Sequence, residues 1–482
     1  MVALKNRWLA LAALVMCVLV IGLDGTVLNV ALATLAADLG ASTGELQWIV
    51  SSYLITFSAF LLPAGLAGDR WGRKKLLLAG LVIFGAASGF AAFAGSTATL
   101  VAARAVMGVG AAIIIPLSMS TLPVIFPPEE RARAISTWTV GMGLALPLGP
   151  IVGGWLLENY WWGSVFLINL PVIAIALIAA AILLPESKDP ASAKLDPLSV
   201  VLSVSGLGLA VYGVIDAPEA GWGSARVLGS LGAATVLIGL FIYRNLRRRE
   251  PMVDLGLFRS PAFTWGTVAT VFAALALMGG LFVVPLYLQA VKGFSAMQTG
   301  WGLVPLILGL MVTGKLAPRI AARLGNRSAI VTGMLLLAAG FALGSLTTTA
   351  SPFVLTGSWL GLAGLGLGLA MVPAMDTVLA SLPEAKAGAG SGLVQTLRQV
   401  AGAFAVAGLG SLLNSIYSNG LSGPAKESIV AAARLGDPAV LFQAQANFVS
   451  GMDVVLIVCA IGSVAGAALV AAFFKARPAP VG

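Results

Sequence analysis

Long apolar runs separated by short polar segments constrain this chain more than any other feature of its sequence. A run of about 20 apolar residues is long enough to cross the hydrocarbon core of a bilayer as one helix. About fourteen such runs fit into the 482 residues, of which 59% are hydrophobic and only 10% charged, and the mean hydropathy is +0.99. We therefore predict an all-α polytopic membrane protein with about fourteen transmembrane helices.

The charges of the polar segments indicate how the spans are oriented. The predicted spans lie near residues 8–32, 46–66, 75–95, 99–121, 134–157, 163–184, 197–215, 227–244, 262–290, 298–317, 328–347, 353–377, 388–414 and 451–474. With the N-terminus inside, about 22 of the 28 Lys and Arg residues fall on the cytoplasmic side and about 4 outside, as the preference of these residues for cytoplasmic loops requires. We expect a multi-pass protein of the cell (inner, cytoplasmic) membrane with both termini in the cytoplasm. The net charge of +9 is explained by this topology and does not indicate a nucleic-acid partner. The first run lacks a small-residue cleavage site, so we expect no cleaved signal peptide.

A charged hairpin at residues 65–75 indicates the internal organisation. It holds three glycines, one acid and four bases in eleven residues, and residues 314–327 resemble it weakly after the second span of a later six-span block, with Pro318 where the first copy has Asp69. Such parallel halves are typical of transporters built from repeats. We expect an N-terminal six-helix half over 1–190, two inserted helices over 191–250 and a C-terminal six-helix half over 251–482. An extracellular loop is expected near 415–450.

Charged residues inside the spans are the candidates for function, because each costs about 2.5–3.5 kcal/mol at the centre of a span. Asp24, Arg104, Asp376 and Arg398 are the clear cases. At about 1.5 Å per residue, Asp24 lies about 24 Å and Arg104 about 25 Å from the cytoplasmic side, so we expect them to pair. The chain has no His, so a proton site near neutral pH requires a carboxylate. For Asp24 and Arg104, both a static ion pair and a carboxylate that exchanges a proton fit the sequence. Asp376 lies near the cytoplasmic end of its span, so it could instead be a helix-end partner of the bases at 70–75.

Several segments resemble a known transporter family. The hairpin matches the G-x-x-x-D-R-x-G-R-K-K signature of the major facilitator superfamily, and residues 23–32 and 100–104 resemble the first-helix and fourth-helix motifs of its drug:proton antiporter family with fourteen helices. Residues 141–154 resemble the antiporter motif of the fifth helix, which importers generally lack. Two departures are Ala33, where the family has Pro, and Gly163, where Arg is common.

The resemblance implies a major facilitator fold and a proton-coupled exporter of lipophilic, cationic drugs or antiseptics that works by alternating access. It links Arg104 to proton coupling, for which Asp24 and Asp376, as acids inside the spans, are the other candidates. The hairpin would form a conformational latch made of Gly65, Asp69, Arg70, Gly72 and Arg73. The antiporter motif would comprise Pro147, Gly149, Pro150, Gly153 and Gly154. A substrate cavity could be lined by aromatic rings, amides and one cation. The candidates are Tyr53, Trp138, Tyr287, Gln289, Gln395 and Arg398, and packing roles fit these residues too. We expect a monomer in the bilayer that uses protons and a small lipophilic substrate, with no cofactor and no metal.

Four alternatives differ in how well they fit the sequence. A transporter or flippase of lipids or lipid precursors with the same fold stays open, because an apolar cavity suits acyl chains as well. A proton symporter for nutrient import fits less well because of the fifth-helix motif. An ATP-driven pump needs a G-x-x-x-x-G-K-[ST] loop, which the sequence lacks. An enzyme would need a cluster of metal ligands or nucleophiles, and a sequence with no His and two separated cysteines offers few residues for one.

Overall fold

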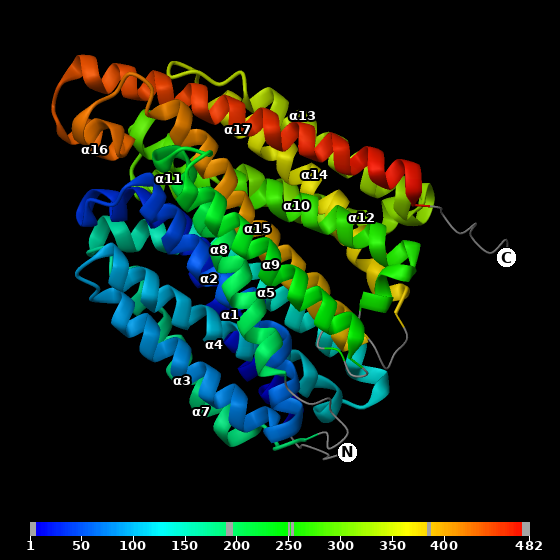
Figure 1. Ribbon diagram of the computed structural model, residues 1–482. Helices are drawn as coiled ribbons and strands as arrows, with labels where there is room; N and C mark the ends of the chain where they lie inside the picture. Colours follow the sequence, from blue (N-terminus) through cyan, green and yellow to red (C-terminus); the bar gives the residue numbers. More distant parts are fainter. Residues whose placement is uncertain (1–5, 189–195, 249–250, 252–254, 383–386, 475–482) are drawn as a thin grey trace. The chain divides into compact units, whose positions relative to one another are not determined.

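The computed structural model describes residues 6–188, 196–248, 251, 255–382 and 387–474, and in these ranges it contains helices and no strands (Figure 1). The chain divides into two compact units. The first unit comprises residues 1–253 with 293–301, and the second comprises 254–292 with 302–482. The all-helical fold predicted from the apolar runs is therefore confirmed.

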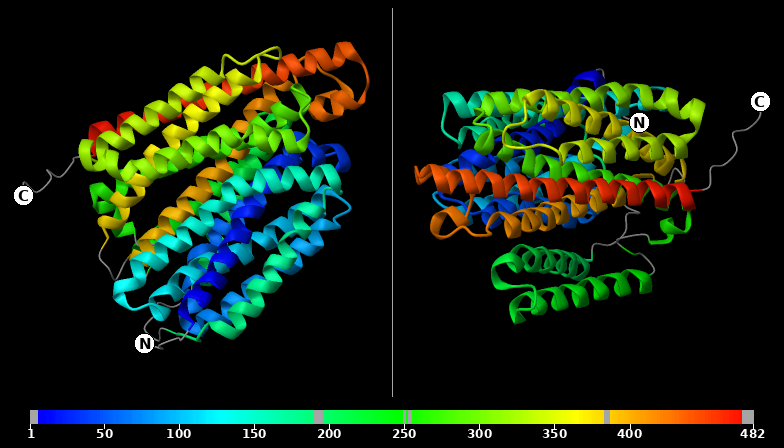
Figure 2. Two further views of the ribbon diagram at one scale, coloured as in Figure 1. Left: turned by 180° about the vertical axis from the view of Figure 1, so that it is seen from behind. Right: turned by 90° about the horizontal axis from the view of Figure 1, so that it is seen from above.

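The first unit is a bundle of long helices. Its helices are α1 (Arg7–Leu39), α2 (Thr43–Trp71), α3 (Arg73–Ala92), α4 (Thr97–Ile125), α5 (Pro128–Asn159), α6 (Ser164–Leu167), α7 (Asn169–Leu183), α8 (Pro197–Ala220) and α9 (Ala225–Arg247). Helix α1 packs against α5, α7 and α4, whereas α3 packs against α4 and α7. Helices α8 and α9 pack against each other, as Figure 2 shows, and α8 also contacts α2. The short helix α11 (Ala296–Gly302) begins in this unit.

Local sequence explains where these helices begin and how closely they approach. Ser42 and Glu45 form a capping box at the start of α2, which satisfies backbone N–H groups that have no partner within the helix. At Gly108 of α4 a Cβ atom would overlap with Thr56 Oγ1 and lie 2.5 Å from the carbonyl oxygen of Tyr53. Glycine is therefore required for the contact between α4 and α2, as is common where membrane helices meet.

The second unit is also a helical bundle. Its elements are η1 (Leu255–Arg259), α10 (Pro261–Leu286), the π-helical turn η2 (Tyr287–Val291), α12 (Val304–Leu324), α13 (Asn326–Gly344), α14 (Phe353–Ala380), α15 (Ala387–Tyr417), η4 (Gly423–Lys426), α16 (Ile429–Arg434) and α17 (Pro438–Phe473). Helix α14 packs against α13 and α12, and α17 packs against α13, α10 and α15.

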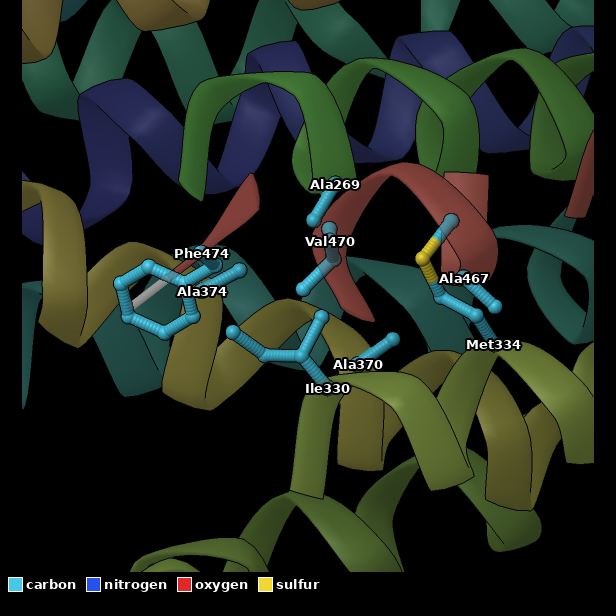
Figure 3. Close-up of a cluster of buried hydrophobic side chains, with 8 residues drawn as sticks. All are labelled: Ala269, Ile330, Met334, Ala370, Ala374, Ala467, Val470 and Phe474. Atoms are coloured by element: carbon cyan, nitrogen blue, oxygen red, sulfur yellow. The ribbon is translucent and has the colours of Figure 1, made fainter. Parts of the chain in front are cut away.

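A cluster of small and branched apolar side chains joins four helices of the second unit. Figure 3 shows its members, which are Ala269, Ile330, Met334, Ala370, Ala374, Ala467, Val470 and Phe474. The alanines leave little room between helices, and a Cβ on Gly333 would overlap with the backbone of α14 at Ala370. Close contact between backbones therefore replaces large side chains in this core.

The observed helices account for the predicted spans with few changes. Twelve helices in the described residues are long and apolar enough to cross a membrane, and α2, bent by 48° at Pro63, makes thirteen. The one predicted span not counted among these thirteen, near 134–157, lies in α5, a helix of 32 residues with a charged first turn and many glycines. The count of fourteen stays a prediction. In the segment near 415–450, η4 and α16 are short helices and α17 already begins at Pro438.

Candidate functional site

The first unit contains a buried ion pair between α1 and α4. Arg104 Nη1 lies 2.5 Å from Asp24 Oδ2, and the residues are 1% and 2% exposed. The guanidinium carbon of Arg104 also lies 4.3 Å from the ring centroid of Tyr53 on α2, and its Nε donates to the carbonyl oxygen of Ile49 at 3.4 Å. The pairing expected from equal depth is present, and the Tyr53 ring, predicted as a cavity wall, stacks on this arginine.

The second oxygen of Asp24 has a partner that the sequence analysis missed. Asn169 Nδ2 donates to Asp24 Oδ1 at 3.2 Å and to Ser88 Oγ at 3.0 Å, and Ser88 Oγ donates to the carbonyl oxygen of Phe166 at 2.8 Å. All of these side chains are buried. The signal that could have identified this residue is a polar amide inside the predicted span 163–184.

The predicted antiporter motif forms the contact of α5 with α1. A Cβ on Gly149 would overlap with Thr26 Oγ1, and one on Gly153 would lie 2.9 Å from Val27 Cγ1. Thr26 Oγ1 donates across this contact to the carbonyl oxygen of Ala145 at 3.1 Å. Because Thr26 follows Asp24 by two residues, α5 is held directly against the segment of α1 that carries the acid.

The remaining motif residues have different surroundings. Gly154 and Pro150 contact the segment 293–301 within the first unit. Gly154 lies against Met297, and the carbonyl oxygen of Pro150 lies against Gly300. The side chain of Pro147 lies outside the described part of the structure. Trp138 is buried, and its Nε1 donates to Ser118 Oγ on α4 at 3.1 Å.

The charged hairpin is built around a glycine with a left-handed backbone. Gly72 has φ +122°, a conformation that residues with a Cβ rarely adopt, and it joins α2 directly to α3. Asp69 Oδ1 accepts from Arg73 Nε at 2.7 Å, whereas Arg70 is exposed and Gly65 lies within α2 against Pro116 of α4.

A second acid, Glu186, completes this hairpin, and it was not predicted. Its carboxylate accepts from the backbone N–H groups of Lys74 and Lys75 at 3.1 and 3.3 Å, and the N–H of Arg73 donates to the carbonyl oxygen of Ser187 at 3.0 Å. These groups are the otherwise unpaired donors at the first turn of α3, where a carboxylate is favourable. The chain after α7 is thereby bound to the predicted latch.

The predicted sites in the second unit are less closely connected. Arg398 Nη1 donates to Gln395 Oε1 one turn away at 3.3 Å, while its buried Nε has no hydrogen-bond partner among the described residues. Tyr287 is buried and its hydroxyl donates to the carbonyl oxygen of Thr348 at 3.1 Å, and Gln289 follows in the π-helical turn. Asp376 is exposed near the end of α14 and forms no ion pair with any residue in the described ranges.

A charge cluster closes one end of the α8–α9 pair. Asp196 accepts from Arg244 Nε and Nη2 at 2.8 and 3.0 Å, lies 2.7 Å from Arg248 Nη1, and accepts from Ser199 Oγ at 2.5 Å. The hydrogen bonds from Arg244 lower the pKa of the Asp196 carboxyl to about 2. This carboxylate therefore stays ionised at any physiological pH.

Comparisons with known proteins show the family of this chain. The family model described as Major Facilitator Superfamily matches residues 14–406. The multidrug efflux pump LfrA of Mycolicibacterium smegmatis is 34% identical over 98% of this chain and 97% of its own length. The tetracenomycin C resistance and export protein of Streptomyces glaucescens is 35% identical over 86% of this chain and 77% of its own. The methyl viologen resistance protein SmvA of Salmonella typhimurium is 31% identical over 87% of this chain and 85% of its own length.

A solved structure supports the fold independently of close sequence similarity. The bacterial homologue of the human lysosomal transporter Spinster, in an inward-facing conformation, matches with a TM-score of 0.70 over 99% of both chains at 16% identity. The structure therefore agrees with the sequence relatives at the level of fold. Because the family model and relatives above 30% identity both cover most of its length, the chain belongs to the Major Facilitator Superfamily and is a transporter.

Proposed function

We propose that the chain is a proton-coupled exporter of lipophilic cationic drugs or antiseptics, which acts as a monomer in the cell membrane with both termini in the cytoplasm. The observation that carries the proposal is the buried pair of Asp24 and Arg104. The relatives named for multidrug efflux, tetracenomycin C export and methyl viologen resistance support export as the direction.

The pair is suited to exchange a proton for a cation. When Asp24 is ionised, its charge and that of Arg104 cancel, so the site is neutral overall and can accept a cationic substrate nearby. Protonation of Asp24 weakens the attraction between α1 and α4 and leaves the positive charge of Arg104 uncompensated. Because this positive charge repels a cation, binding of the proton and binding of the cation disfavour each other, which is the thermodynamic requirement for antiport. The proton gradient supplies the energy, so no cofactor is needed.

Two further features fit alternating access. The glycines that hold α5 against α1 permit the helices to slide or pivot without displacing large side chains. The hairpin around Gly72, with Asp69, Arg73 and Glu186, would serve as the latch on the cytoplasmic side. Asp376 and the pair of Arg398 with Gln395 are secondary candidates for coupling and substrate contact.

The test is transport driven by a pH gradient in proteoliposomes with a methyl viologen or quaternary ammonium probe. Asp24→Asn fixes the neutral form, so we expect uphill transport to vanish while downhill exchange survives. Arg104→Gln alone leaves a buried carboxylate without its ionic partner, so we expect a loss of about 3–5 kcal/mol of stability. A matched control is Glu129→Gln, an exposed acid at the start of α5, which should transport normally.

The double variant Asp24→Asn/Arg104→Gln decides between a proton carrier and a static pair. A static pair predicts that restoring charge neutrality recovers both stability and uphill transport. A proton carrier predicts recovery of stability alone, because the proton site is still missing. Full recovery of uphill transport would therefore rule out the coupling role of Asp24, and transport of a labelled phospholipid but of no cation would favour the lipid alternative.

A further inference from the structure

The most informative unassigned group is the amide of Asn169, which is the first residue of α7 and lies beside Asp24. We propose that Asn169 is a positioning residue that responds to the protonation of Asp24: its amide donates to the ionised carboxylate and reverses to accept from the protonated one. The inference rests on the proposed proton-coupled function and adds a residue to that site.

The hydrogen bonds around Asn169 have a fixed direction. A carboxylate can only accept, so Asn169 Nδ2 must be the donor to Asp24 Oδ1. The hydroxyl hydrogen of Ser88 is used on the carbonyl oxygen of Phe166, so Ser88 Oγ accepts from the same Nδ2. Asn169 and Ser88 are 1% and 0% exposed, so water does not compete for these bonds. The amide is therefore held with its NH2 group toward the acid.

Protonation of Asp24 changes the requirement on this amide. The other oxygen, Oδ2, faces the guanidinium of Arg104, which can only donate, so the proton is accommodated on Oδ1. There the new O–H would point at the NH2 group of Asn169, and two donors that face each other form no hydrogen bond. Rotation of the amide by about 180° places its carbonyl oxygen at this position, where it accepts from Asp24. The hydroxyl of Ser88 then turns to donate to Asn169 and releases the carbonyl of Phe166.

The reversal carries the change of charge to other helices. Ser88 lies on α3, Phe166 on α6, and Asn169 begins α7 after a break in the helix at Ile168. Pro171 has no N–H, so the carbonyl of Leu167 lacks its usual helical partner and the backbone is already irregular here. Protonation on α1 is thereby linked to the packing of α3 and to the junction of α6 and α7.

Few charged groups compete with this role. Arg104 from α4 and Tyr53 from α2 are the titratable groups that face Asp24. Helices α6 and α7 carry no charged residue, and those of α3 and α5 lie at the helix ends, at 73–75, 129–133 and 158. Among the described partners of Asp24, Asn169 is the one that can change from donor to acceptor.

The test replaces the amide by apolar groups and follows the titration of Asp24 itself. The infrared band of the Asp24 carboxyl is the one that is absent in Asp24→Asn. Titration of this band gives the pH at which half of Asp24 is protonated, and the measurement does not depend on transport. In Asn169→Leu and the smaller Asn169→Ala, both forms of Asp24 lose a hydrogen bond. Because the bond to the charged carboxylate is the stronger of the two, we expect the midpoint to rise by about 1 pH unit. The carboxylic-acid band at low pH should also move to higher wavenumber, because its O–H has lost an acceptor. Asn169→Gln keeps an amide and should restore the midpoint toward that of the unmodified chain.

The pH profile of uphill transport provides the second readout and should move in the same direction. The matched control is Thr347→Val, which removes an equally buried hydrogen bond with Trp359 in the second unit and should leave both midpoints unchanged. An unchanged midpoint in both apolar variants would overturn the proposal for Asn169, whatever happens to transport. A shifted infrared midpoint in a chain that shows no pH-driven transport would support the role of Asn169 at Asp24 and contradict the proposed function instead.

Discussion

At the scale of single residues, glycine decides where α1 and α5 can meet. Gly149 gives the backbone of α5 access to Thr26, two residues after Asp24, at a separation that any side chain would prevent. The positions of Asp24 and of its partners on α4 and α7 depend on how α1 is held, so this glycine acts on the site without touching it. The fifth-helix motif is thus part of the support of the acid.

Gly149→Ala tests this support. The new Cβ would overlap with Thr26 Oγ1 and lie 2.7 Å from Thr26 Cβ, so α5 must move away. We expect a loss of about 1–3 kcal/mol of stability, as for other overpacked sites, and a fall in transport. The control is Gly408→Ala on α15, where a Cβ would meet nothing within 4 Å and where alanine should be neutral or slightly stabilising. Thermal unfolding in detergent measures both, and equal effects would contradict the packing argument.

At the scale of elements, the α8–α9 pair has very different ion pairs at its two ends. At one end Asp196 is nearly buried and contacts Arg244 and Arg248 at 2.7–2.8 Å. At the other end Asp216 lies 3.6 Å from Arg226, whose side chain is 66% exposed. Because one partner of this longer ion pair is largely exposed, we expect it to contribute little, so the ion pairs of Asp196 should hold the two helices together.

The pH dependence of stability should report the strong end. The pKa of Asp196 is lowered from 3.8 to about 2, so its contribution is fully present above about pH 4 and is lost as the pH falls through about 2. Because the two arginines are about one-third exposed, we expect Asp196→Asn to cost about 1–2 kcal/mol at pH 7. The cost should shrink between pH 4 and pH 2. Asp216→Asn should cost no more than a few tenths of a kcal/mol, and a larger effect there would contradict this ranking.

At the scale of the whole molecule, the distribution of charge along the chain predicts the orientation in the membrane. The loops expected on the cytoplasmic side hold most of the 28 Lys and Arg residues. The two cysteines, Cys17 and Cys459, are both buried, so an engineered surface cysteine can be labelled selectively. The α8–α9 pair is the critical test of the number of spans, because two crossings return the chain to the same side and leave the orientation of the later spans unchanged.

Labelling with a membrane-impermeant maleimide tests the orientation. Trp222→Cys, at the exposed turn between α8 and α9, should react in intact cells. Lys188→Cys, after α7, should react only when the membrane is opened. Reaction of position 222 from the cytoplasmic side alone would remove two inserted transmembrane helices from the topology and would leave twelve or fewer spans to be assigned.

The sequence by itself determined which segments are helices, that Asp24 and Arg104 lie at the same level of the bundle, and where the chain turns. Depth follows from counting, because a helix rises by a constant amount per residue, and this is why Asp24 and Arg104 could be paired across 80 positions. The hairpin around Gly72 was equally readable, because glycines and charges are rare inside apolar runs.

Only the tertiary structure decided which faces of the helices meet. The contact of Asn169 with Asp24 joins residues 145 positions apart, and the contact of Glu186 with Lys74 joins residues 112 apart. Nearly every face of these helices is apolar, so the sequence pattern does not indicate the rotation of a helix about its axis. That rotation is set by close packing of glycines such as Gly149 against particular neighbours, which exists only once the bundle has formed.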